Sequence, residues 1–168
     1  MHNSSLEIRE FLDTGFDLKI HLAEFLKISL VQLEKKLPSG IDDLAALHPG
    51  ALNFDDASDF YENQVGSAHL IDLAAWHLNS SNYIADTLRL QAMYAKGQVL
   101  DFGGGIGTHA LAAAGLSNVE HVTFVDLNPK NREFVLARAA ALGITNSISV
   151  QRDLDNINDI KFDTLICL

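Results

Sequence analysis

The sequence predicts an α/β fold in which a parallel sheet follows a helical N-terminal region. Three observations lead to this class. Apolar residues recur at helical spacing through most of the first 96 residues, strand and helix patterns alternate from Gln98 onward, and a glycine-rich turn joins the first predicted strand to the next helix. We therefore expect two regions, a helical one at residues 1–96 and a sheet-containing one at residues 97–168.

The N-terminal region is predicted to be helical apart from one loop. Residues 4–37 carry apolar residues at helical spacing and are predicted to form a helix, which Pro38 and Gly40 are expected to end. Residues 50–66 show little periodicity and are predicted to form a loop. Further helices, two of them preceded by serines that could cap them, are predicted over residues 41–47, 67–78 and 80–95.

The C-terminal region alternates between strand and helix patterns. Its strands are short runs rich in apolar residues, predicted at residues 99–102, 121–125, 147–151 and 162–168. The helices between the first three strands are predicted at residues 108–114 and 129–142. Because strands that are joined through helices pair in parallel with right-handed crossovers, these elements predict a parallel sheet.

Composition and charge narrow the classes of function. The chain of 168 residues is 48% hydrophobic and 20% charged, which predicts a folded domain with a sizeable core. The formal net charge is -10, so the chain is not expected to have the basic surface that binds nucleic acid phosphates or anionic membranes. Neither partner is therefore expected. The single cysteine, Cys167, excludes an internal disulfide and a cysteine-rich zinc site, and no metal site is predicted. The N-terminus lacks a secretory signal pattern, so a cytoplasmic location is expected.

The most informative segment is residues 99–108. Asp101 ends a predicted buried strand, and before the next helix come Gly103, Gly104, Gly105 and Gly107. Glycines let the chain turn sharply and let a ligand approach the backbone, and the helix N-terminus offers free N–H groups. A carboxylate at this place would repel a pyrophosphate but attract a cationic amino group. Two alternatives stay open here: a tight turn without ligand, and a dinucleotide site, because the later part of the loop also satisfies the G-x-G-x-x-A pattern.

A second carboxylate, Asp126, follows the predicted strand 121–125. Because the C-terminal ends of adjacent parallel strands lie side by side, Asp126 should face the same crevice as the glycine loop. There it can accept hydrogen bonds from both hydroxyls of a ribose, each contributing about 1.5–3 kcal/mol. Capping of the following helix is the alternative, although Asn128 is better placed for that.

Asp101, Gly103, Gly105 and Gly107 match every defined position of the pattern acidic-x-Gly-x-Gly-x-Gly. In this the chain resembles the class I S-adenosylmethionine-dependent methyltransferases, whose motif I has this pattern, over residues 98–168. The resemblance implies a Rossmann-like sheet with the strand order 3-2-1-4 and S-adenosylmethionine as cofactor. It also implies that the glycine loop wraps the methionine part of the cofactor and that Asp101 reaches its amino group, often through water.

The resemblance further implies roles for residues after the second and third strands. Asp126 would hold the ribose, and Leu127 would pack on the adenine. After the third strand, Asp153, with Asp155 as the alternate, would accept a hydrogen bond from the adenine amino group, and the backbone N–H of Leu154 would meet the ring. The alternative for Asp153 is a polar residue that merely ends a strand.

Aromatic and histidine residues upstream form a weaker candidate site for the substrate. Tyr61, His69 and Trp76 are predicted to form a lid or a substrate wall, with a histidine as candidate base. The alternative is a core-facing stripe, because His69, Trp76 and His77 fall on one face of a predicted helix. His109 follows the glycine loop and would either contact the cofactor or be solvated.

The sequence therefore predicts an enzyme that transfers a methyl group from S-adenosylmethionine to a small-molecule acceptor. The alternatives are an NAD(P)-binding oxidoreductase domain and a non-catalytic cofactor-binding or regulatory module. A complete class I domain has seven strands, whereas this sequence ends within the fourth. We therefore expect a fragment of a longer protein, inactive alone, whose catalytic residues lie beyond Leu168. The methyl acceptor, the attacked atom and the oligomeric state are not predicted.

Overall fold

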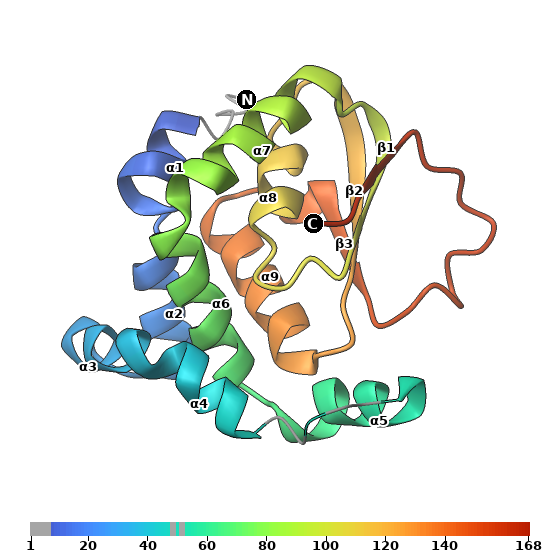
Figure 1. Ribbon diagram of the computed structural model, residues 1–168. Helices are drawn as coiled ribbons and strands as arrows, with labels where there is room; N and C mark the ends of the chain where they lie inside the picture. The colour runs from blue at the N-terminus through green and yellow to red at the C-terminus, as the bar shows by residue number, and fades with distance from the viewer. Residues whose placement is uncertain (1–7, 48–49, 51–52) are drawn as a thin grey trace.

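Helices precede the sheet in the computed structural model, which describes residues 8–47, 50 and 53–168 (Figure 1). The α-helices before the sheet are α1 (Ile8–Thr14), α2 (Leu18–Leu26), α3 (Leu30–Lys36), α4 (Gly40–Leu47), α5 (Phe54–Asp59), α6 (Ala68–Asn79) and α7 (Ser81–Tyr94). A 3₁₀ turn at Leu37–Ser39 joins α3 to α4, and a π-helical turn at Phe60–Gln64 follows α5.

The predicted single helix over residues 4–37 is wrong, because its described part, from Ile8, consists of α1, α2 and α3. The first break is a left-handed turn at Gly15, Phe16 and Asp17, where φ is 64°, 55° and 55°. Such φ values cost a non-glycine residue about 1–2 kcal/mol. The carbonyl groups of Gly15 and Phe16 accept hydrogen bonds of 3.0 and 3.2 Å from the buried Arg138 guanidinium, which offsets part of this cost.

Gly40 begins a helix instead of ending one, which corrects the prediction for Pro38 and Gly40. Pro38 lies in the 3₁₀ turn, and Gly40 has a φ of -55°, within the right-handed helical region. A side chain on Gly40 would have its Cβ 3.1 Å from the carbonyl oxygen of Ile71 in α6. The glycine therefore permits close packing of α4 on α6, which is a tertiary requirement. The predicted short helix at residues 41–47 is confirmed as α4.

The predicted loop at residues 50–66 is also wrong in its larger part, although residues 51–52 lie outside the described residues. Here α5 is one and a half turns long, and the Asn53 side chain caps it by accepting a 2.9 Å hydrogen bond from the backbone N–H of Asp56. The π-helical turn continues directly from it. Elements this short contain too few residues for a helical period to be visible in the sequence.

The sheet consists of four parallel strands in the order β3-β2-β1-β4, as expected. In chain order the strands are β1 (Gly97–Phe102), β2 (Val119–Val125), β3 (Ile148–Gln151) and β4 (Thr164–Ile166). Helices α8 (Thr108–Ala114) and α9 (Pro129–Ala141) form the first two crossovers. Gly97, with φ of 60°, begins β1.

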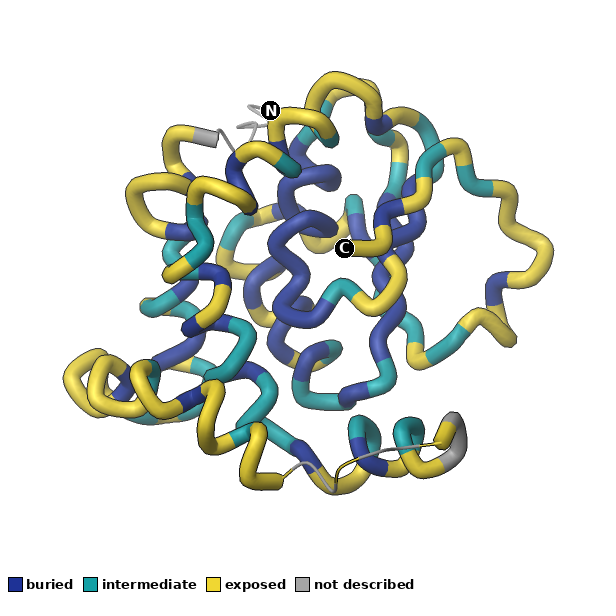
Figure 2. Tube along the Cα trace, viewed as in Figure 1, coloured by how far each residue is buried: buried dark blue, intermediate teal, exposed yellow. Residues whose placement is uncertain are grey.

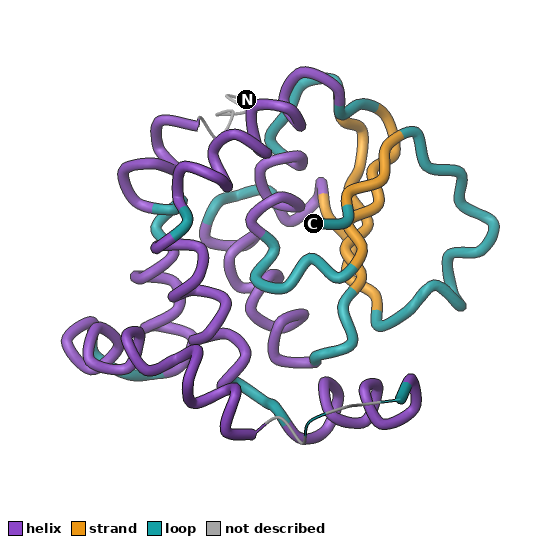
Figure 3. The backbone as a smooth tube through the Cα atoms, in the orientation of Figure 1, coloured by secondary structure: helices purple, strands orange, loops and turns teal. Residues whose placement is uncertain are grey.

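The crossovers place different segments on the two faces of the sheet (Figures 1 and 3). The steps from β1 to β2 and from β2 to β3 run in one direction, so right-handed crossovers put α8 and α9 on the same face. The return from β3 to β4 runs the opposite way, and its connection, residues 152–163, covers the other face. There Ile157 and Phe162 pack against Leu100 and Val125.

The N-terminal helices cover the outer side of α8 and α9, so α8 is buried along its whole length (Figure 2). One core cluster joins both parts of the chain, since Leu22 of α2 and Leu70 of α6 belong to it together with Ile106 and Phe134. No helix in the described ranges is long and apolar enough to span a bilayer.

Candidate functional site

A hollow of about 530 Å³ opens where β1, β2 and β3 reach their C-terminal ends. It lies at the end of β1, the strand at which the order of the sheet reverses, because β2 and β3 are added on one side of β1 and β4 on the other. Such reversals are the usual ligand sites of open α/β sheets. The hollow brings together most of the predicted site residues, from both halves of the chain. Its lining consists of Tyr61, His69, Phe102, Gly103, Val125, Asp126, Leu127, Arg152, Asp153 and Leu154.

The glycine loop at the end of β1 is shaped by its lack of side chains. Gly103, Gly105 and Gly107 have φ of 73°, 56° and 71°, a region that side-chain-bearing residues rarely adopt. A Cβ on Gly104 would lie 2.5 Å from the Asp101 carboxylate, so this position is sterically restricted. At Gly103, by contrast, a Cβ would meet no described residue within 4 Å. The loop is thus tightly packed underneath and open on the side of the hollow.

Asp101 lies beneath this loop and is only 2% exposed. Its carboxylate accepts a hydrogen bond from the backbone N–H of Ala110 in the first turn of α8, but Oδ2 has no partner within the described part of the chain. Burial, reinforced by the nearby Asp126 carboxylate, raises the pKa of Asp101 to about 7. Asp101 is not among the residues that line the hollow, so a ligand would reach it only through the glycine loop or through water.

Asp126 does line the hollow, and it is held in place by three hydrogen bonds. Oδ2 accepts from the backbone N–H of Gly105 at 2.9 Å, and Oδ1 accepts from the backbone N–H of Asn128 at 2.8 Å and from Asn131 Nδ2 at 3.1 Å. Burial raises the pKa of Asp126, and these hydrogen bonds oppose that shift. Asn128, not Asp126, caps α9, by accepting from the backbone N–H of Lys130. A carboxylate has about four acceptor positions, so one stays available to a ligand.

The far wall of the hollow is built by an ion-pair network that the sequence analysis missed. Arg152, just after β3, donates from Nε and Nη2 to the two carboxylate oxygens of Glu62, both at 2.7 Å, and from Nη1 to Asp153 at 2.6 Å. These pairs lower the pKa of Glu62 and of Asp153. They hold the π-helical turn against the end of β3 and fix the Asp153 side chain. Asp155, the predicted alternate, is exposed and does not line the hollow. The 90 residues between Arg152 and Glu62 leave no local signal for this contact.

The upstream aromatic and histidine residues separate into two places. Tyr61 and His69 line the hollow, with ring centroids 5.3 Å apart. Trp76 is 40% exposed and lies against His77 and Tyr83 instead, outside the hollow. His109 is buried in α8, where its Nε2 lies 2.8 Å from the Thr87 hydroxyl, so it is not solvated. Cys167 is exposed.

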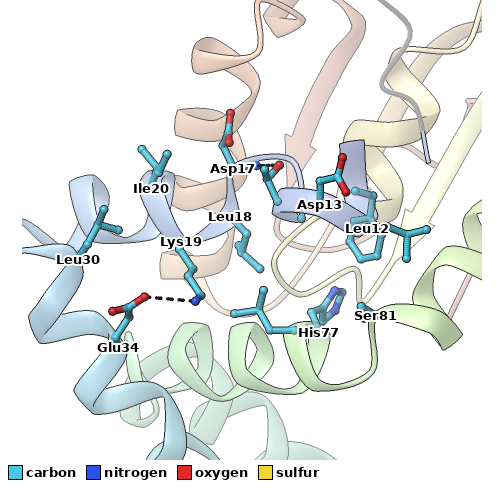
Figure 4. Close-up of a pocket in the computed structure, with 14 residues that line it drawn as sticks. Leu12, Asp13, Asp17, Leu18, Lys19, Ile20, Leu30, Glu34, His77 and Ser81 are labelled. Carbon is cyan, nitrogen blue, oxygen red and sulfur yellow. Dashed lines mark hydrogen bonds and ion pairs between the residues drawn. The ribbon is translucent and has the colours of Figure 1, made fainter. Parts of the chain in front are cut away.

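A second hollow, of about 360 Å³, lies among α1, α2, α3 and α6 (Figure 4). His77 points into it from α6, and burial lowers the pKa of this histidine to about 3, so the ring is neutral at pH 7. A Lys19–Glu34 ion pair of 3.4 Å lies at its other end. This hollow contains neither the glycine loop nor a strand end, so it is separate from the predicted site.

The family model of the methyltransferase small domain matches residues 70–167, which is more than half of the chain. The chain belongs to this family of class I S-adenosylmethionine-dependent methyltransferases. A search of curated proteins gives no match.

Membership in the methyltransferase small domain family agrees with the sheet order and with the glycine loop at the end of β1. The matched range begins at Leu70, inside α6, so it includes α7 together with the whole sheet. Tyr61, Glu62 and His69 precede it. The methyltransferase domain thus receives one wall of its hollow from residues outside the matched range.

Proposed function

We propose that this protein binds S-adenosylmethionine in the hollow at the strand ends and transfers its methyl group to a small-molecule acceptor. The observation that carries this proposal is the buried Asp101 carboxylate beneath the glycine loop, whose Oδ2 lacks a partner among the residues that the structure describes. An unpartnered buried anion is costly, and a cationic amino group on the ligand would relieve that cost. The pyrophosphate of a dinucleotide would instead add negative charge beside two buried carboxylates.

The lining residues support specific roles in holding this cofactor. The remaining acceptor position of Asp126 would receive a ribose hydroxyl. Leu127 and Leu154 supply apolar surface for the adenine, and Asp153, oriented by Arg152, would accept from its amino group. Gly103 leaves open space where the methionine part would approach the backbone. The cofactor supplies a methyl group on a sulfonium, so the contribution of the protein is binding, orientation and exclusion of water.

The charge of the chain supports a small acceptor over a nucleic acid. The net charge of -10 provides no counter-charge for a phosphate backbone. We therefore expect S-adenosylhomocysteine to form from S-adenosylmethionine when a low-molecular-weight fraction of cell extract is added, and not when RNA or DNA is added. Product formation only with nucleic acid would overturn the choice of acceptor class.

Calorimetry and thermal unfolding with two ligands test the cofactor. S-adenosylhomocysteine at 100 times its Kd should stabilise the fold by about 2.7 kcal/mol, and NAD should not. Asp126→Asn should weaken S-adenosylhomocysteine binding about tenfold, because an amide accepts hydroxyl hydrogen bonds less strongly than a carboxylate. The matched control is Asp159→Asn, an exposed aspartate outside the hollow, which should bind as the wild type does. Stabilisation by NAD alone would favour the oxidoreductase alternative.

A further inference from the structure

Three polar side chains from three different elements form a chain that ends at the hollow. Asp126 follows β2, Asn131 lies in the first turn of α9, and His69 lies near the start of α6. Asn131 Nδ2 is 3.1 Å from Asp126 Oδ1 and 3.2 Å from His69 Nδ1. Asn131 is fully buried and Asp126 is 8% exposed, so bulk water has little access to the contact between these two residues.

The Asp126 carboxylate fixes the orientation of the Asn131 amide. Both carboxylate oxygens already act as acceptors, Oδ2 for the backbone N–H of Gly105 and Oδ1 for that of Asn128. If the Asn131 amide were turned around, its oxygen would face Oδ1, and two acceptors would lie in contact. The amide NH₂ group therefore faces Asp126. One of its hydrogens is donated to Asp126, and the other points to His69.

The orientation of the amide in turn fixes the proton on His69. Since Asn131 donates to Nδ1, that nitrogen must carry a lone pair, and the proton of the neutral ring is then on Nε2. Burial lowers the pKa of His69 to about 4, so the ring is neutral at pH 7. Within the described part of the chain Nε2 makes no hydrogen bond, and the ring lines the hollow beside Tyr61.

We propose that His69 is a cofactor-binding residue whose Nε2–H donates a hydrogen bond to a ribose hydroxyl oxygen. The same hydroxyl group would donate its hydrogen bond to the Asp126 carboxylate. This inference rests on the proposed function. It assigns part of the ribose site to the N-terminal helical region, outside the matched family range. It also argues against His69 as a general base, because Nε2 already carries the proton of the neutral ring and Nδ1 is occupied by Asn131.

The tautomer can be measured without any ligand. In long-range ¹H–¹⁵N spectra of the uniformly labelled full chain, His69 is assigned by comparison with His69→Gln. We expect the shifts of an Nε2–H tautomer at pH 7, and Asn131→Leu should shift the population toward a mixture of tautomers. A ring protonated on Nδ1, or a charged ring, in the wild type would overturn the inference.

Binding measurements test the contact to the ribose. His69→Phe keeps an aromatic ring but removes the donor, and it should weaken S-adenosylhomocysteine binding about fivefold. His69→Gln places an amide N–H near the position of Nε2 and should restore most of the affinity. Far-UV circular dichroism checks that both variants are folded. Wild-type affinity in His69→Phe, or equal losses in both variants, would refute the hydrogen bond.

Deoxynucleosides separate this inference from the proposed function. If the wild type binds adenosine, the loss caused by His69→Phe should disappear with either 2′-deoxyadenosine or 3′-deoxyadenosine, which identifies the hydroxyl. A loss that persists with both would contradict a ribose contact. Failure of the wild type to bind S-adenosylhomocysteine or adenosine would refute the proposed function and the ribose contact together, whereas the tautomer measurement would still report on the Asp126–Asn131–His69 chain by itself.

Discussion

Replacement of Asp101 by asparagine should make the protein more stable and a poorer ligand binder at the same time. The carboxylate is 2% exposed, and Oδ2 has no partner in the described part of the chain. Burial raises the pKa of this carboxyl group from its ordinary value of 3.8 to about 7. An asparagine has nearly the same shape, and its oxygen can still accept from the backbone N–H of Ala110. The substitution therefore removes the charge and little else.

The magnitude follows from the pKa difference between the folded and unfolded states. Folding raises the pKa of Asp101, so the wild type loses stability as the pH rises through the interval between about 4 and 7. At about 1.4 kcal/mol per pKa unit, the raised pKa costs roughly 2 kcal/mol of stability at pH 5.5, where folding requires the carboxyl group to take up a proton. The cost is roughly 4 kcal/mol at pH 8, where the buried carboxylate is ionised. The buried amide nitrogen of Asp101→Asn would cost about 1–3 kcal/mol. We therefore expect the free energy of unfolding of Asp101→Asn to exceed that of the wild type by about 1–3 kcal/mol at pH 8. At pH 5.5 this difference should be about 2 kcal/mol smaller.

Urea unfolding at the two pH values measures this difference, with the exposed Asp159→Asn as control. Calorimetry on the same samples should show that Asp101→Asn binds S-adenosylhomocysteine more weakly, since the substitution removes the charge that we propose attracts the amino group of the ligand. A variant that is less stable than the wild type at pH 8, or whose stability difference does not change with pH, would refute the account of an unpaired buried carboxylate.

Two further substitutions test how the loop and the N-terminal region are held. Gly107→Ala should lower the free energy of unfolding in urea by about 2–4 kcal/mol, because φ is 71° and the added Cβ would lie 2.5 Å from the Val135 side chain in α9. Gly143→Ala is the control, with the same φ but no described residue within 4 Å of the added Cβ, and it should cost only about 1 kcal/mol. Equal losses would contradict the steric argument. Arg138→Met should cost at least about 3 kcal/mol, since it leaves the buried carbonyls of Gly15, Phe16 and Ile106 without their donor, and a near-neutral result would show that these hydrogen bonds contribute little.

The sheet region was predictable because its signals are local. The signals are apolar strand runs, the glycine-rich turn and the Asn128 cap, and each lies within a few residues of the element it defines. The bounds of β1, α8, β2, α9 and β3 lie within two residues of those expected. The expected order of four parallel strands is confirmed as well. In the N-terminal region the same reasoning failed at the turn after α1 and at residues 54–64, where the chain conformation depends on distant partners or on very short helices.

The sequence by itself determined the chemistry at the ends of β1 and β2: a carboxylate, a glycine-rich loop, and a second carboxylate one strand away. Only the tertiary structure decided how these groups are used. It buries Asp101 with no partner for Oδ2 among the described residues. It also brings Glu62 to Arg152 and His69 to Asn131, pairs that are 90 and 62 residues apart. Hydrogen-bond partners and burial set pKa values and tautomers, and both depend on which segments meet in space. The pattern of residue types therefore predicts the site, whereas only the packed molecule fixes its protonation and its walls.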